Sequence, residues 1–191
     1  MSQTTRCFIG LGGNLDNPEQ RIQNACDQLG EIRLCQLSKV SSLYVSEPLR
    51  STSAANSDQP NYINAVVELF TQLSAEQLLD ELQNIEQQHG RTRSHKRWQS
   101  RTLDLDILLF GDHQISSERL QIPHQEMLNR NFVVYPLREI ASDLILPSGV
   151  SLQQAISQSR LEPLKTLQQH SPVKPEQLSA PISPHSRSHS A

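Results

Sequence analysis

The pattern of apolar and polar residues along the chain predicts a mixed α and β fold. The apolar run at 7–11 ends at two glycines, which is typical of a buried strand followed by a sharp turn. Residues 62–71 alternate between two faces, as a central strand does, and the stretch at 32–44 favours a strand because it lacks a helical stripe. Another apolar run at 103–110 predicts a strand that ends at a turn beginning with Gly111.

Two segments between these strands carry apolar residues at helical spacing. In the first, Asn17 and Pro18 form a helix start, with Asn17 expected as the cap and Gly30 as the stop. In the second, residues 74–77 read Ser-Ala-Glu-Gln, which is a capping box that opens a helix ending near Gly90. Long loops are expected before the third strand and before the fourth.

The order of these elements predicts an α+β fold with a ferredoxin-like βαββαβ core. Its sheet should be mainly antiparallel and covered by helices in three αβα layers, with long mobile loops. The last aromatic residue is Tyr135, a short closing helix is expected at 150–156, and Ser, Gln, Pro and His dominate after it. We therefore expect one folded domain over 1–157 and a Ser/Pro/His-rich disordered tail over 158–191.

Composition and charge disfavour several functional classes. The 191 residues include 17 Lys and Arg against 20 Asp and Glu, which gives a formal net charge of −3. General binding to nucleic acid or to a membrane surface needs a positive field, which this balance does not supply. No apolar run approaches the roughly 20 residues of a membrane span. Three cysteines without C-x-x-C spacing disfavour a disulfide framework and a zinc site, and fit a reduced cytoplasmic protein.

The strongest chemical signal is the pair Asp104 and Asp106 in the last predicted strand. Residues two apart on a strand share a face and lie about 6.6 Å apart, so both carboxylates should project together. That spacing lets them reach divalent cations held about 3.5–4 Å apart. Oxygen ligands suit Mg²⁺, which commonly shares the phosphate oxygens of a nucleotide. A solvated strand face would show the same bare pattern.

A basic segment at 91–101 precedes this strand and contains Trp98. It holds five of the 17 basic residues of the chain. Guanidinium groups bind phosphate oxygens bidentately, and an aromatic residue in a polar loop can stack on a flat ring. Together with the two aspartates, this segment favours a nucleotide–metal site over a solvated basic loop.

Two weaker signals lie elsewhere. Residues 10–14 read Gly-Leu-Gly-Gly-Asn, which matches neither G-x-G-x-x-G nor a P-loop and indicates only a turn that lets a ligand approach the backbone. His124 follows a proline and lies near Arg119 and Arg130 in sequence. It could be a structural histidine or a ligand contact.

Short motifs run in order along the chain, at 9–15, 41–44 with 48–49, 59–65, 85–91, 97–98, 101–107 and 122–132. Through these motifs the chain resembles, over 8–157, the 6-hydroxymethyl-7,8-dihydropterin pyrophosphokinase family of folate biosynthesis. The most specific is Arg-Thr-Leu-Asp-Leu-Asp-Ile at 101–107, with Arg97 and Trp98 upstream. The chain departs from the family pattern at Gly13, Glu47 and Gln125, where Ser, Pro and Tyr are common.

The resemblance implies a reaction and its partners. The diphosphate of ATP would pass to the hydroxymethyl group of the pterin, releasing AMP, with two Mg²⁺ ions as cofactors. It implies a cytoplasmic monomer whose partners are ATP and 6-hydroxymethyl-7,8-dihydropterin, with no nucleic acid and no membrane.

The resemblance also assigns site residues. It places Asp104 and Asp106 as Mg²⁺ ligands and adds two arginines to them, so that the catalytic set is Arg91, Arg101, Asp104 and Asp106. The ATP-binding set that it implies is Gln83, Arg93, Trp98, Arg101, Ile107, Arg119 and His124, with Glu86 near the nucleotide. The pterin-binding set is Ser46, Glu47, Leu49, Tyr62, Asn64, Trp98, Asp104 and Phe132, in which the rings of Trp98 and Phe132 would enclose the pterin.

Two other functions fit parts of the sequence. A ferredoxin-like RNA-binding module could use the basic segment, although an aromatic content of 4% and a pI near 6.1 disfavour it. An ordinary kinase on the same scaffold would transfer only the γ-phosphate, and the composition does not exclude it. The nucleotide product distinguishes the three, being AMP, ADP or none.

Overall fold

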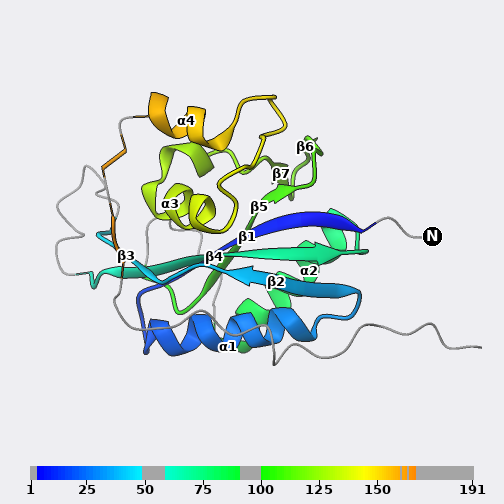
Figure 1. Cartoon of the computed structure of the whole chain (residues 1–191). Coiled ribbons are helices and arrows are strands. Elements are labelled where there is room, and N and C mark those ends of the chain that lie inside the picture. The colour runs from blue at the N-terminus through cyan, green and yellow to red at the C-terminus, as the bar shows by residue number, and fades with distance from the viewer. Residues whose placement is uncertain (1–3, 49–58, 91–99, 160, 163, 167–191) are drawn as a thin grey trace, which may run out of the picture.

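The computed structural model of the chain describes residues 4–48, 59–90, 100–159, 161–162 and 164–166. Its centre is an antiparallel sheet in the order β5-β1-β4-β3-β8, in which β2 also pairs with β4 (Figure 1). The strands are β1 (Thr5–Gly13), β2 (Cys35–Val40), β3 (Tyr44–Ser46), β4 (Tyr62–Thr71), β5 (Asp104–Phe110) and β8 (Lys165–Thr166). This order and direction confirm the predicted split βαββαβ core.

Helices cover both faces of the sheet and make three layers (Figure 1). The helices α1 (Pro18–Glu31) and α2 (Ala75–Gln88) lie on one face, and α3 (Asn131–Ile140) with α4 (Leu152–Gln158) on the other. A separate small sheet pairs β6 (Ile115–Ser116) with β7 (Gln121–Ile122), and a 3₁₀ helix at Met127–Asn129 precedes α3. In the described part of the chain, no helix is both long and apolar enough to cross a membrane.

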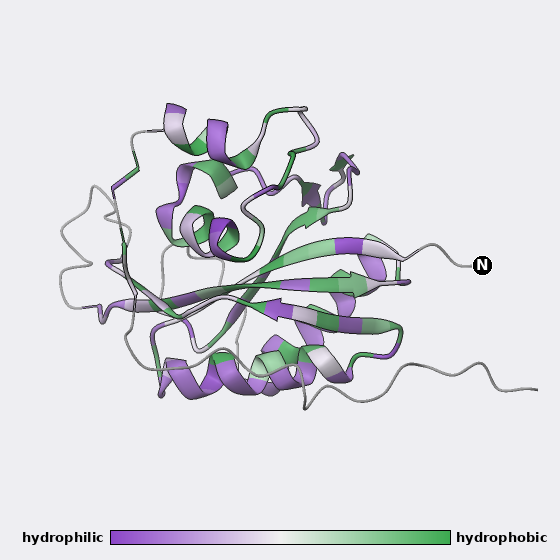
Figure 2. Ribbon diagram, in the orientation of Figure 1, coloured by the Kyte–Doolittle hydropathy of each residue, from purple (hydrophilic) through white to green (hydrophobic). Residues whose placement is uncertain are grey.

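The core consists of two apolar layers, one on each side of the sheet. Beneath α1 and α2, Ile9, Val67 and Leu105 pack with residues such as Leu29 and Leu82. On the other side, Phe8, Val66 and Leu108 pack against Val134, Leu137 and Leu152. Figure 2 shows the same division, with hydrophobic stretches along the central strands and hydrophilic positions along α1. Because β4 is buried on both faces, its polar residues Asn64 and Glu68 are also buried.

The predicted strand at 32–44 is two strands in the structure. Ser41 interrupts it, because its hydroxyl accepts a hydrogen bond from the backbone N–H of Val66 at 3.0 Å while its own N–H donates to the Val66 carbonyl at 2.9 Å. The side chain thus replaces a backbone partner in the ladder. β3 then pairs antiparallel with the first residues of β4, as β2 does with the last, and it reaches the pocket described below.

The helix ends differ from the predictions in detail. The Ser74 hydroxyl accepts from the N–H of Gln77 at 3.2 Å, and the Gln77 side chain accepts from the N–H of Ser74 at 2.9 Å, so the capping box is confirmed. The side chain of Asn17 makes no cap hydrogen bond, because Asn17 adopts a left-handed conformation (φ 61°). Gly30 lies inside α1 and does not stop it.

α3 has no counterpart among the individually predicted elements. Pro136 lies within it, and proline is unfavourable inside a helix. The buried face of Val133, Val134, Leu137 and Ile140 stabilises the helix through packing, which local propensity does not reveal.

Ordered structure extends past the expected start of the tail at 158. Asn131 donates to the carbonyl of Glu162 at 3.0 Å, and the Tyr135 hydroxyl donates to the carbonyl of Leu161 at 3.3 Å. β8 then pairs with β3, with Thr166 opposite Tyr44. The remainder of the predicted tail, 167–191, lies outside the described residues, as do 49–58 and 91–99 of the predicted loops.

Candidate active site

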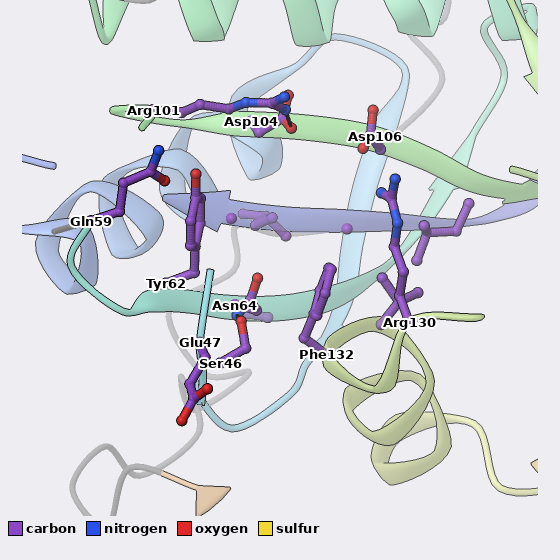
Figure 3. Close-up of a pocket in the computed structure, with 16 residues that line it drawn as sticks. Ser46, Glu47, Gln59, Tyr62, Asn64, Arg101, Asp104, Asp106, Arg130 and Phe132 are labelled. Atoms are coloured by element: carbon purple, nitrogen blue, oxygen red, sulfur yellow. Dashed lines mark hydrogen bonds and ion pairs between the residues drawn. The ribbon is translucent and has the colours of Figure 1, made fainter. Parts of the chain in front are cut away.

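A pocket lies on the α3 side of the sheet, where β1, β4 and β5 come together (Figure 3). Its walls come from β3, from the start of α3 and from the segment before β5. The lining residues are Gly10, Leu11, Gly12, Ser46, Glu47, Gln59, Tyr62, Asn64, Ala65, Arg101, Asp104, Asp106, Leu108, Arg130, Phe132 and Val133.

The glycines of β1 form the floor of this pocket. Gly10 pairs with Asp106 and Gly12 with Asp104 across the β1–β5 ladder. A Cβ atom at Gly12 would lie 3.3 Å from Oδ1 of Asn64, so a side chain there would crowd the polar group opposite. The glycines predicted to form a turn are therefore the last residues of a strand. Their missing side chains leave open space between β4 and β5.

Asp104 and Asp106 project into the pocket from one face of β5 (Figure 3), as the sequence predicts. Leu105 lies between the two aspartates in sequence and Ile107 follows them. Both side chains are buried in the core layer on the other face of the sheet. The Arg101 guanidinium forms an ion pair with Asp104, and Nε2 of His124 lies 3.9 Å from Oδ2 of Asp106. One strand thus supplies two acidic groups to the pocket, next to Arg101 and His124.

The pKa of Asp106 is raised. Restricted hydration in the protein is the larger cause and the neighbouring Asp104 carboxylate the second, while His124, Arg130 and Arg101 oppose the shift. Two carboxylates in one site disfavour each other's charged form. A divalent cation between them would relieve that repulsion, so the donor set fits Mg²⁺.

The described residues contain no group of three or more His, Cys, Asp or Glu side chains placed to hold a metal ion. Mg²⁺ is usually bound by one or two carboxylates and completes its octahedron with water and substrate phosphates. Asp104 and Asp106 are the residues that would hold it.

The other half of the pocket combines aromatic rings with an oriented side-chain amide. The Asn64 side-chain N–H₂ donates to Oγ of Ser46 at 3.0 Å and to the carbonyl of Tyr44 at 3.4 Å, which fixes the amide. The Phe132 ring and the Tyr62 ring stand on either side of Asn64 (Figure 3). The guanidinium carbon of Arg130 lies 5.9 Å from the centre of the Phe132 ring. Apolar surfaces thus flank a small number of oriented polar groups.

Eight of the predicted residues are brought together here. From the catalytic and pterin-binding sets, the pocket lining includes Ser46, Glu47, Tyr62, Asn64, Arg101, Asp104, Asp106 and Phe132. Arg91, Arg93, Trp98 and Leu49 belong to segments outside the described residues.

Five of the described residues that were predicted to bind ATP or to lie near it are not part of the lining. The side chain of Ile107 is buried in the core beneath α1 and α2, so only its backbone could contact a ligand on the pocket side. Arg119 is bound to Asp80 at 2.5 Å, and Gln83 lies on α2. Glu86 is buried, and its Oε1 accepts from the N–H of Leu105 at 2.7 Å. His124 adjoins the pocket through Asp106.

Two polar lining residues are absent from the predicted sets. Gln59 lies just before β4 and opens the shared motif at 59–65, but no role was assigned to it. Arg130 precedes α3 and stands beside Phe132. Its position near His124 in sequence was a signal for this site, but the contact with Phe132 depends on the turn into α3.

Comparison with known proteins agrees with this geometry. A family model described as 7,8-dihydro-6-hydroxymethylpterin-pyrophosphokinase matches residues 8–142. A 2-amino-4-hydroxy-6-hydroxymethyldihydropteridine pyrophosphokinase of Haemophilus influenzae is 46% identical over 151 residues, which is 79% of this chain and 91% of the relative. The Pseudomonas aeruginosa protein of the same name is 43% identical over 162 residues, covering 85% of this chain and 96% of its own.

A solved structure supports the fold. The Plasmodium falciparum HPPK-DHPS protein with pteroate superimposes with a TM-score of 0.62 at 14% identity, over 82% of this chain and 42% of that one. This chain therefore spans about two fifths of that longer protein. With a family match over most of its length and relatives above 40% identity, the chain belongs to the 7,8-dihydro-6-hydroxymethylpterin-pyrophosphokinase family.

Proposed function

We infer that the chain transfers the diphosphate of ATP to the hydroxymethyl group of 6-hydroxymethyl-7,8-dihydropterin, giving AMP and the pterin diphosphate in folate biosynthesis. One observation carries this inference beyond the family match. A single pocket combines an acidic pair beside Arg101 with an aromatic and amide-lined compartment, so it offers both a place for a metal–nucleotide and a place for a flat heterocycle.

Phosphoryl groups transfer through a loose transition state, so the protein contributes mainly alignment and charge stabilisation. When bound, Mg²⁺ would neutralise phosphate charge and make the attacking hydroxyl more acidic. We propose that Asp104 and Asp106 hold two such ions. Arg101, already at Asp104, would exchange part of that ion pair for contacts with phosphate oxygens.

The pterin would lie over the glycine floor. Asn64 is held by Ser46 and Tyr44, so its carbonyl oxygen is oriented before the ligand arrives. Phe132 would supply one aromatic face, while Arg130 beside it adds positive charge close to Asp106. This arrangement would direct the hydroxymethyl group toward the two aspartates.

The product assay tests the function against its alternatives. Purified chain is incubated with MgATP and 6-hydroxymethyl-7,8-dihydropterin, and nucleotides and pterins are separated by chromatography. AMP and a pterin diphosphate in equal amounts are expected. ADP with a pterin monophosphate would assign the chain to ordinary kinases, and no turnover with saturating Mg²⁺ would contradict both. Omission of the pterin is the control for simple ATP hydrolysis.

We propose that the protein acts as a cytoplasmic monomer. All three cysteines are free, which fits a compartment that keeps thiols reduced. Light scattering on the purified chain tests the monomer, since a dimer would double the mass of 21.5 kDa.

A further inference from the structure

The residue that follows β1 is polar and yet almost fully buried. Asn14 is 3% exposed and does not line the pocket. It belongs to the Gly-Leu-Gly-Gly-Asn segment that the sequence marks, and the site described above uses only the glycines of that segment. The side chain therefore calls for an explanation other than direct ligand contact.

Asn14 links three parts of the chain by hydrogen bonds. Its Oδ1 accepts from the backbone N–H of Arg101 at 2.8 Å. Its Nδ2 donates to the carbonyl of Pro60 at 3.1 Å and to Oγ of Ser100 at 3.3 Å. The backbone N–H groups of Asn14 and Leu15 both donate to the Arg101 carbonyl, at 2.9 and 3.2 Å. Arg101 is thus held on both sides of its Cα.

These partners require a side-chain amide. The N–H of Arg101 can only donate and the carbonyl of Pro60 can only accept, so the group between them must present one acceptor and one donor. Aspartate would keep the acceptor and lose the donor. Alanine would lose both and leave the Arg101 N–H and the Pro60 carbonyl without these partners.

Asn14 connects the segment that contains Arg101 with the segment that contains Pro60. These two segments form opposite sides of the pocket. Arg101 reaches the acidic pair through Asp104, whereas Pro60 lies between the lining residues Gln59 and Tyr62. The end of β1 packs closely against the segment that carries Arg101, since a Cβ at Gly13 would lie 2.6 Å from the Thr102 carbonyl oxygen. A small displacement at Asn14 would therefore reach both walls.

We propose that Asn14 is a positioning residue that sets the Arg101 wall and the Tyr62 wall of the pocket at their working separation. The proposal rests on the proposed function. Misplacing reacting groups by about 1 Å can cost a factor of about 100 in rate, and this loss comes in addition to the stability lost with the hydrogen bonds. Asn14 should therefore affect kinetics beyond its effect on folding.

Three variants separate positioning from stability. Asn14→Ala removes both contacts, and Asn14→Asp keeps the acceptor for Arg101. Thr71→Val is the matched control, because Thr71 is 0% exposed and its hydroxyl accepts from the N–H of Leu73 at 3.0 Å, at the end of β4 far from Tyr62. For each, Tm, kcat and the KM for both substrates are measured with folded protein, as checked by circular dichroism.

For Asn14→Ala we expect kcat to fall about tenfold or more and the KM for the pterin to rise about tenfold, since each wall loses a contact. Asn14→Asp should raise the pterin KM similarly while kcat stays within about threefold of the wild type, because Arg101 keeps its acceptor. Thr71→Val should lower Tm and leave kcat and both KM values unchanged.

Two results would overturn the proposal. One is Asn14→Ala with a lowered Tm and wild-type kinetics, which is what a merely structural residue gives. The other is equal kinetic loss in Thr71→Val. If Asn14→Ala does not fold, Asn14→Asp alone tests whether the kinetic effect is separate from the effect on Tm. An unchanged pterin KM in that variant contradicts a positioning role. A wild-type chain without AMP formation would instead refute the proposed function, so the two failures are distinct.

Discussion

The Glu86 carboxylate of α2 accepts a hydrogen bond from the backbone N–H of Leu105 at 2.7 Å, midway between Asp104 and Asp106. β5 is an edge strand, paired only with β1 among the described strands of this sheet, so part of its backbone has no neighbouring strand. A buried side chain supplies that missing acceptor. The position of the acidic pair is therefore fixed from α2 as well as from β1.

Replacing Glu86 by alanine should destabilise the protein and slow the reaction. The Leu105 N–H would lose its partner in a buried position, which costs about 1–3 kcal/mol of the free energy of unfolding. Turnover should fall because both carboxylates depend on that part of β5. Urea unfolding and initial rates at saturating MgATP measure the two effects.

Two further variants control this test. Glu86→Gln keeps a carbonyl acceptor and should recover most of the stability. Glu81→Ala removes an exposed glutamate from the same helix and should change the free energy of unfolding by less than about 0.5 kcal/mol. Equal stability of Glu86→Ala and Glu81→Ala would show that the Leu105 contact contributes nothing.

Asp106→Asn should separate function from stability. Turnover should fall by several orders of magnitude, because one proposed metal ligand is lost. The ligand-free protein should be as stable as the wild type or more so, since the raised pKa of Asp106 shows that its charged form is unfavourable in the folded state. Calorimetry without Mg²⁺ and a product assay with saturating Mg²⁺ measure both.

The same pKa shift sets the direction of a pH dependence. A carboxyl with a raised pKa takes up its proton at a higher pH than the ordinary value of about 3.9, so Mg²⁺ binding should weaken as the pH falls through that raised value. Over the same fall in pH, this carboxyl makes the ligand-free folded state more stable relative to the unfolded state. In Asp106→Asn this contribution to stability disappears, and an unaltered pH profile of stability would argue against Asp106 as its source.

Phe132→Leu should weaken pterin binding with little effect on ATP. The substitution keeps an apolar side chain at the start of α3 and removes the aromatic face, for which a loss of roughly tenfold in affinity is expected. Phe70→Leu, near the far end of β4, is the matched control and should leave pterin affinity unchanged. Titration calorimetry with each ligand distinguishes the two, and equal pterin affinities would exclude a stacking role for Phe132.

Gly13→Ser would install the residue that is usual at this position in the family pattern. In this chain a Cβ at residue 13 would lie 2.6 Å from the carbonyl oxygen of Thr102, so the backbone next to Arg101 must move. A cost of about 1–3 kcal/mol in stability is expected, together with slower turnover. Gly30→Ser in α1 should be nearly neutral, and a Gly13→Ser protein of wild-type Tm and rate would show that the strand accommodates the side chain.

Local signals predicted those parts of the fold that depend on local chemistry. The capping box at Ser74, the strand at Tyr62–Thr71 and the shared face of Asp104 and Asp106 follow from side-chain type and period alone. The interruption at Ser41 and helix α3 depend on contacts with residues distant in sequence, so no local pattern revealed them. The same limit applies to Arg130, whose place beside Phe132 is created by the start of α3.

The sequence by itself determined the order of the βαββαβ core elements, the acidic pair on β5 and, through its motifs, the family. Only the tertiary structure decided that the glycines of β1 form an open floor, that Glu86 supports Leu105 from the opposite layer, and that Asn14 joins the two walls. The physical reason is the range of the forces involved. Residue periodicity reports which face of a strand is apolar, whereas the distance between two walls depends on packing and hydrogen bonds between segments far apart along the chain.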